Sequence, residues 1–439
     1  MKTSRIPRKA FACLLLAGSC IPGMQGAVAA DLDTTLSASI GRSDNIFRTE
    51  EDPVEETIST VGVALDFLQT GRRGSADIDI NADYVSYRDD AFDNELIGGA
   101  RVFADYFLVE EVLDWDLQFN YGQQVSNPLV AVTPDNREDV TYLTTGPNLE
   151  LDLGERFVFG ARAEYSTMDY EVTPNDNTRT GYRASIGRRI SEGRMLSLVG
   201  SVDEVDYDLV DSTADYDRQR VFLRFESFNS RGSLTVEAGV NEIDQEGSSE
   251  KQDGTLFVVD WVRDLAAGIQ VSLGAGSRYS DQGDIFRFFR NTRSDLRATE
   301  DVAGIATPFR NDFATARFRI DRSRTNVNIV AIYSDEDYEE ASDFNREVTQ
   351  LRLSVGRQFT RKFFGEIGAS RVSQEFSELD RDDRDMQYNL TLGYRIIPAV
   401  SARLSFQRFD RSTNQGVTEF DEERVFLRFS YVPEWTREQ

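Results

Sequence analysis

The chain has 439 residues, with 76 Asp or Glu against 49 Lys or Arg, no histidine, and a formal net charge of −27. This excess of acid opposes binding to nucleic acid, which we exclude as a partner. Its two cysteines, Cys13 and Cys20, stand near the N-terminus, so the rest of the chain lacks the usual nucleophile–base pairs and zinc ligand sets. We therefore predict no metal and no cofactor, and an enzyme is the weaker hypothesis.

The first 30 residues have the pattern of a secretory signal peptide. Four basic residues stand among the first nine, an apolar stretch follows at 11–18, and Ala27, Val28 and Ala29 precede the first acidic residue, Asp31. The apolar stretch is too short for a membrane-spanning helix. We expect residues 1–30 to be removed, which leaves an exported chain of charge −31 with no cysteine for a disulfide.

After residue 31, apolar and polar residues alternate in segment after segment. Ala76, Ile78 and Ile80 alternate with Asp77 and Asp79, and the pentapeptide VFLRF, at 221–225 and 425–429, follows the same rule. Period-two alternation is typical of a strand whose two faces meet different surroundings. We count about 20 such segments of about 10–14 residues, a length that suits tilted membrane strands.

The connections between these segments alternate in length. Tight ones, such as residues 191–194 and 322–325, alternate with longer acidic ones, such as 44–56, 124–138 and 375–385, and the longest covers 281–311. Short turns on one rim and long loops on the other are typical of outer-membrane barrels. A soluble β-sandwich gives no reason for such strict alternation.

Aromatic residues follow the same division. All three tryptophans, Trp115, Trp261 and Trp435, stand beside tight turns, whereas tyrosines such as Tyr87 and Tyr207 stand at the ends near long loops. Amphipathic rings prefer the two membrane–water interfaces. A general preference of aromatics for strands would not sort tryptophan from tyrosine in this way.

These patterns predict an all-β fold: a transmembrane antiparallel outer-membrane β-barrel of about 20 strands, with 18 as the alternative. We expect the barrel to cover residues 31–432, followed by a short periplasmic tail at 433–439. Tight turns and both termini should face the periplasm, and the long acidic loops should be extracellular. In VFLRF, Val, Leu and Phe should face lipid, and the arginine should face a polar lumen.

The predicted lumen face carries acid on the early strands and base on the later ones. We hypothesise an acidic wall opposite a basic wall across a water-filled channel, since lumen charge selects what passes. Pairing across neighbouring strands, which would only stiffen the barrel, is the alternative. The candidate pore-lining residues are Asp77, Asp79, Asp83, Asp114, Asp116, Arg162, Arg224, Arg317, Arg319, Arg352, Arg403 and Arg428.

Residues 281–311 contain IFRFFRNTRSDLR, an aromatic and basic run that contrasts with the acidic loops. This segment could fold into the lumen as a constriction, bind a carbohydrate or anion, or lie on lipopolysaccharide. The acidic runs at 375–385 and 133–139 lack EF-hand spacing, so we interpret them as solvated loops or weak cation sites.

The first predicted strand ends in GRSDNIFRTE, whose residues Ser43, Asp44, Asn45, Ile46, Phe47 and Arg48 resemble the β-barrel porin 2 family. The resemblance implies an outer-membrane protein of a Gram-negative bacterium that assists exopolysaccharide export. It carries over no catalytic residues. A Ser-Asp-Asn turn also has an ordinary local explanation in the hydrogen bonds of its side chains.

The leading functional hypothesis is a non-enzymatic channel for polysaccharide export. The alternatives are a general diffusion porin for small solutes, a structural or adhesive surface barrel, and a membrane hydrolase that uses Asp77/Asp79 or Glu164/Glu226. The expected partners are outer-membrane lipid, lipopolysaccharide, the barrel assembly machinery and, for export, a polysaccharide and periplasmic export proteins.

Overall fold

The computed structural model describes residues 30–127, 129–208, 215–246, 251–291, 307–338, 341–415 and 419–433. The predicted signal peptide, Trp435 and most of the predicted tail lie outside these ranges. Residues 292–306 of the longest predicted loop lie outside them as well.

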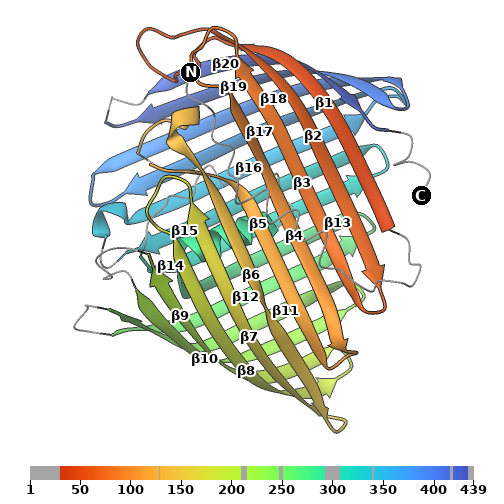
Figure 1. The fold of residues 1–439 in the computed structure, drawn as a ribbon, viewed down its shortest axis with the longest axis vertical. Coiled ribbons are helices and arrows are strands. Elements are labelled where there is room, and N and C mark those ends of the chain that lie inside the picture. The colour runs from red at the N-terminus through yellow and green to blue at the C-terminus, as the bar shows by residue number, and fades with distance from the viewer. Residues whose placement is uncertain are drawn as a thin grey trace.

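The fold is a closed antiparallel barrel of 20 strands (Figure 1). Each strand pairs with the next along the chain, and the pairing of β1 with β20 closes the circuit. The predicted count of about 20 is confirmed, and the alternative of 18 is wrong. The strands are β1 (Ala30–Ser43), β2 (Glu56–Gly71), β3 (Gly74–Tyr87), β4 (Glu95–Val109), β5 (Leu113–Val125), β6 (Arg137–Leu153), β7 (Phe157–Tyr170), β8 (Asn177–Ser191), β9 (Arg194–Tyr207), β10 (Tyr216–Asn229), β11 (Gly232–Gln245), β12 (Gln252–Ala266), β13 (Ile269–Ser280), β14 (Phe309–Arg322), β15 (Thr325–Asp337), β16 (Arg346–Gln358), β17 (Phe363–Phe376), β18 (Arg381–Ile397), β19 (Val400–Thr413) and β20 (Phe420–Tyr431).

The two faces of the sheet differ as the alternation predicts. In β10, Val221 and Leu223 are about half exposed, at 54% and 52%, whereas Phe222 between them is 4% exposed. The second copy of VFLRF, in β20, likewise exposes Val425, Leu427 and Phe429 on the outer face. Large apolar side chains are therefore presented outward on many strands, which is costly in water and favourable in lipid.

The connections sort by rim as predicted. Every connection that leads from an even-numbered strand to the next has at most four residues, and most connections on the other rim are longer. One prediction was wrong: the acidic run at 375–385 is not a long loop, because β17 extends to Phe376 and β18 begins at Arg381. The charges of this run stabilise the strand, since Asp383 pairs with Arg381 at 2.9 Å and with Arg411 at 2.6 Å.

Within the described ranges, three short helical segments accompany the strands: α2 (Gln282–Asn291), η1 (Pro134–Asn136) and η2 (Ser342–Phe344). Helix α2 follows β13 and lies inside the barrel, where its teal ribbon is seen between the walls in Figure 1. Among the described residues, no helix has the length and apolarity needed to cross a membrane. The small buried clusters, such as Ile46 with Ile58 and Tyr87, lie near the rim of long loops.

We predict that Leu223→Arg will destabilise the folded protein by about 2–4 kcal/mol in lipid vesicles, because it places a charge on the lipid face near the membrane midplane. Thr235→Arg is the matched control, since Thr235 lies on the inner face opposite Glu226 and Asp260 and its change should cost little. Urea unfolding followed by tryptophan fluorescence measures both. Equal losses for the two variants would contradict the assignment of the faces.

Candidate functional site: the charged lumen and its constriction

Helix α2 reaches the opposite inner wall through one buried aromatic side chain. Phe286 is fully buried and packs against Val140 and Tyr142 of β6 and Met168 of β7. These wall residues lie several strands away from β13 and β14, the strands that the α2 segment connects. Of the three alternatives for the 281–311 loop, folding into the lumen is therefore confirmed for its first turns.

The start of α2 is held by a buried aspartate. Asp281 precedes the helix, and its side chain accepts a hydrogen bond from the N–H of Asp284 at 2.8 Å, the usual geometry of a helix N-cap. The same carboxylate lies 2.6 Å from the Arg179 guanidinium on β8 and accepts a hydrogen bond from the Tyr216 hydroxyl on β10. Asp281 is fully buried, so its charge is tolerated because these donors surround it.

A second carboxylate completes the attachment. Asp284 lies 2.7 Å from Arg218 of β10 and 3.6 Å from Arg179. We call Arg179, Arg218, Asp281 and Asp284 the carboxylate clamp. Both guanidinium groups are nearly buried, with side-chain exposures of 8% for Arg179 and 5% for Arg218. Sequence reasoning missed the clamp because its members come from three separate segments of the chain.

The adjoining residue of α2 contacts a third part of the barrel. The side-chain amide of Gln282 donates to the Tyr338 hydroxyl at 2.8 Å, and that hydroxyl donates to Glu336 at 3.1 Å. Glu336 also pairs with Arg346 at 2.9 Å. Burial raises the pKa of Tyr338 well above its ordinary value, and the neighbouring Glu336 charge acts in the same direction. The hydroxyl therefore stays protonated and keeps donating.

The strand register places all twelve candidate pore-lining residues on one face of the sheet, the face that α2 contacts. For example, Asp79 is opposite Arg101, Ser272 is opposite Arg317, and Val330 is opposite both Arg317 and Arg352. Strands β4 and β14 are ten strands apart, half of the circuit, so the acidic residues of β3 and β5 lie across the barrel from the arginines of β14 and β16. Arg162 and Arg428, in contrast, lie beside acidic candidates. Their role in lining an open pore stays a prediction.

Several of the acidic candidates pair within the wall. Arg101, which sequence reasoning missed, contacts both Asp77 and Asp79. Asp116 lies 2.9 Å from Arg162, and Asp83 lies 3.6 Å from Arg428. Asp114 accepts a hydrogen bond from Asn148 at 3.2 Å, Arg224 pairs with Glu226 at 2.9 Å, and Arg319 pairs with Asp321 at 3.0 Å. Cross-strand pairing therefore accounts for part of the lumen charge, as the alternative interpretation held.

Other inner-face arginines form no ion pair with any described residue. These are Arg317 and Arg352, on either side of Val330, and Arg183 on β8, which sequence reasoning missed. The Arg403 guanidinium lies over the ring of Phe364, 5.6 Å from its centroid. Arg183 could have been found from alternation, since Arg179 and Arg183 alternate with the outward Tyr182 and Ala184.

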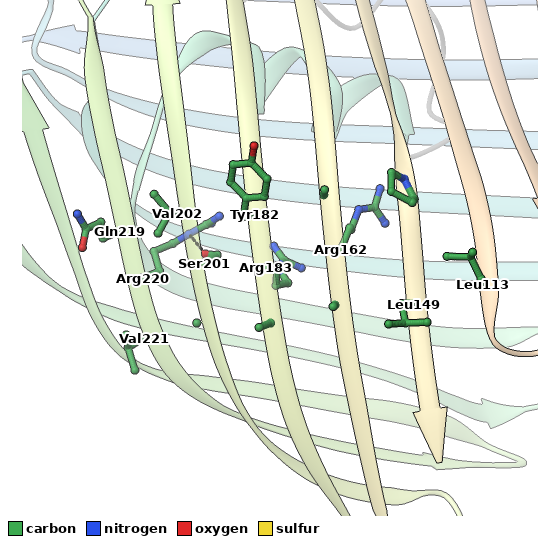
Figure 2. Close-up of a pocket in the computed structure, with 15 residues that line it drawn as sticks. Leu113, Leu149, Arg162, Tyr182, Arg183, Ser201, Val202, Gln219, Arg220 and Val221 are labelled. Carbon is green, nitrogen blue, oxygen red and sulfur yellow. Dashed lines mark hydrogen bonds between the residues drawn. The ribbon is translucent and has the colours of Figure 1, made fainter. Parts of the chain in front are cut away.

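Three arginines lie side by side below the constriction. Arg162 on β7 is directly opposite Arg183 on β8 (Figure 2). Ser201 on β9 lies between Arg183 and Arg220 of β10 and is opposite both of them. Arg220 donates to Ser201 at 3.1 Å and pairs with Asp203 at 2.6 Å. Like charges directly opposite destabilise a sheet, and Asp116 and Glu164, at 2.9 and 3.0 Å from Arg162, offset this repulsion.

The carboxylates named for a hydrolase are not brought together as an acid–base pair. Arg101 contacts both Asp77 and Asp79, so their carboxylates form ion pairs within the wall. Glu164 pairs with Arg162 at 3.0 Å on β7, and Glu226 is on β10. The described residues also contain no group of three or more side chains suited to hold a metal ion.

The segment that resembles the β-barrel porin 2 family completes the closure of the barrel. The Ser43 hydroxyl donates to Glu422 of β20 at 2.5 Å, and the Asn45 side chain donates to the backbone of Asp421 at 2.9 Å. Arg48 lies 3.0 Å from Glu422, which is fully buried. Arg48 has a left-handed backbone, with φ of 56°, a conformation that costs a non-glycine residue about 1–3 kcal/mol.

The β5–β6 connection, residues 126–136, contacts the far side of the same rim. The Arg48 guanidinium donates to the carbonyl of Val132 at 2.5 Å, and Arg381 of β18 donates to the carbonyl of Leu129 at 2.7 Å. Backbone carbonyls of the β5–β6 connection thus accept hydrogen bonds from Arg48, which follows β1, and from Arg381 on β18. This segment and α2 both narrow the barrel toward its long-loop rim.

No protein-family profile matches the chain, and no curated protein sequence matches it either. Among solved structures, the siderophore receptor PirA from Acinetobacter baumannii is similar at 7% identity and a TM-score of 0.48, over 93% of this chain and 81% of that one. The copper transporter OprC has 10% identity and a TM-score of 0.43, over 92% and 80%. OccK2 (OpdF) from Pseudomonas aeruginosa has 11% identity and a TM-score of 0.38, over 92% of this chain and 98% of that one. Likenesses this distant say nothing about what this chain transports.

We predict that Glu422→Gln will destabilise the folded barrel by about 3–5 kcal/mol, because it removes a fully buried carboxylate charge that pairs with both Arg48 and Arg424. The neighbouring Glu423→Gln is the control, since Glu423 pairs with Arg408 at the surface, with 42% of its side chain exposed, and should cost about 0–1 kcal/mol. Denaturant unfolding in vesicles measures the difference. Losses of similar size would show that the rim contact does not stabilise closure.

Proposed function

We propose that this chain forms an outer-membrane channel for small anionic hydrophilic solutes. The observation that carries the proposal is a set of inner-face arginines that form no ion pair with a described residue. They are Arg317 and Arg352, across the barrel from the acidic strands, and Arg183 on β8. Arg183 is exposed although it lies on the inner face. An exposed cation on that face fits a hydrated lumen, in which a guanidinium attracts carboxylate or phosphate groups.

The placement in a membrane is supported by the outer face. Apolar side chains such as Leu36, Ile186 and Leu390 are exposed there on strands around the whole circuit. A closed barrel also leaves no unpaired strand edge, which lipid does not tolerate. Together with the predicted signal peptide, these features favour the outer membrane of a Gram-negative bacterium.

The size of solute is limited by α2. Twenty strands enclose an interior wide enough for an aqueous channel, but the carboxylate clamp and Phe286 hold α2 across part of it. A small solute could pass beside the helix, whereas a polymer would have to move it. The arrangement therefore favours small solutes over the export of a chain.

Acidic polysaccharide export is the narrower candidate. It is favoured by the resemblance at residues 43–48, although those side chains also have the structural role of closing the barrel. Uronate units of such a polymer would suit the same arginines. Oligomers of an acidic polysaccharide added to one side of a bilayer would block the current if they enter, and absence of any block would exclude this candidate.

We predict that replacing Arg183, Arg317 and Arg352 with glutamine will lower the anion-over-cation permeability ratio severalfold, because three positive charges that form no ion pair with the described residues leave the lumen. The reversal potential of single channels in a KCl gradient measures the ratio. The unreplaced protein should be anion-selective.

The matched control is Arg371→Gln, which removes an arginine from the outer face of β17. Its reversal potential should equal that of the unreplaced protein. An unchanged reversal potential in the triple variant would refute the pore role of the arginines, and no conductance from a correctly folded barrel would refute an open channel.

A further inference from the structure

We propose that Arg179 and Arg218 form a dicarboxylate-binding site in the lumen, and that Asp281 and Asp284 of α2 occupy this site as internal competitors. A solute with two carboxylates displaces them and releases α2 from the wall. The inference rests on the proposed channel function and adds a ligand class and a means of opening to it.

The arginines are held by the wall itself. Arg218 also pairs with Asp203 at 3.3 Å and donates to the carbonyl of Tyr279 at 3.5 Å. Arg179 is oriented by Asn177, whose side-chain oxygen is 3.5 Å from the Arg179 Nε. These contacts come from β8, β9 and the end of β13, so both guanidinium groups keep their positions when α2 leaves. Departure of α2 takes two carboxylates away from these guanidinium groups, and Arg218 keeps only Asp203 as an ion-pair partner among the contacts named here. The site then favours a new anion.

The two occupying carboxylates define the ligand. Asp281 and Asp284 are three residues apart at a helix start, where side chains at this spacing lie about 5–6 Å apart at their Cβ atoms. Arg179 contacts both carboxylates, and Arg218 contacts Asp284. A short dicarboxylate can place its two groups at a similar separation. A monocarboxylate of equal size can replace only one of them.

The attachment of α2 is weak enough to be exchanged. The helix has ten residues, a length that is marginal without tertiary contacts. Its residue Gly283 has no side chain to pack, and a Cβ there would lie 2.8 Å from the Arg179 guanidinium. Displacement exchanges one pair of carboxylates for another on the same arginines, so the ligand must exceed the effective concentration of the tethered pair, which is on the order of mM. It must also offset the contacts that Phe286 and Gln282 lose when α2 leaves.

The test uses the refolded chain from Asp31 onward in planar bilayers, with glutarate as the probe and butyrate at matched ionic strength as its control. We expect tens of mM glutarate to raise the conductance and butyrate to leave it unchanged. Asp284→Asn should lower the glutarate concentration for half-effect about tenfold, because one charged contact of α2 is lost. Asp281→Asn should also lower the glutarate concentration for half-effect, because it removes a charged contact while asparagine still caps the helix.

A substitution remote from the carboxylate clamp provides the control. Asp253→Asn, an exposed acidic change on β12, should leave the half-effect concentration unchanged.

An equal response to glutarate and butyrate would overturn the inference. Arg179→Gln with Arg218→Gln must abolish the glutarate effect in a barrel that heat modifiability shows to be folded. Failure of this inference is distinguishable from failure of the channel proposal. The anion selectivity of the basal current depends on Arg183, Arg317 and Arg352, and it is measured without glutarate.

Discussion

Closure of the hydrogen-bond circuit is the constraint on which the rest of the molecule depends. In lipid, each unpaired backbone N–H or C=O costs several kcal/mol, so the first and last strands must pair. That pairing is short: β1 meets β20 over eight residue pairs, against fourteen between β1 and β2. The contacts of Ser43, Asn45 and Arg48 with β20 extend the junction beyond the strands. This need explains why a buried Glu422 and a left-handed Arg48 are retained there.

A closed circuit of 20 strands also determines the contents of the lumen. Alternation gives each strand an apolar outer face and a polar inner face, and a barrel this wide has more interior than its wall side chains can fill. The β13–β14 connection supplies part of the missing contents as α2. Phe286 finds an apolar site between β6 and β7, while Asp281 and Asp284 find cations on β8 and β10. Fold and constriction thus follow from the same geometry.

Features that depend on local pattern could be predicted from the sequence, and features that depend on register could not. Alternation located the strands and placed residues such as Arg224 and Arg428 on the inner face, because side-chain direction repeats every two residues. The acidic run at 375–385 was misread, since its charges resemble those of a loop until Arg411 is known to lie beside Asp383. Arg101, Glu422 and the carboxylate clamp were missed because their partners lie one to several strands away.

Burial separates two kinds of charge in the lumen. Wall pairs such as Asp116 with Arg162 keep about a third of each side chain exposed, so water weakens them and breaking one costs little. The clamp residues are nearly buried, and removing one partner there leaves a desolvated charge. A passing anion can therefore exchange freely with the exposed arginines. At the buried arginines of the clamp, the anion must take the place of a carboxylate of α2. That requirement makes these arginines the more selective site.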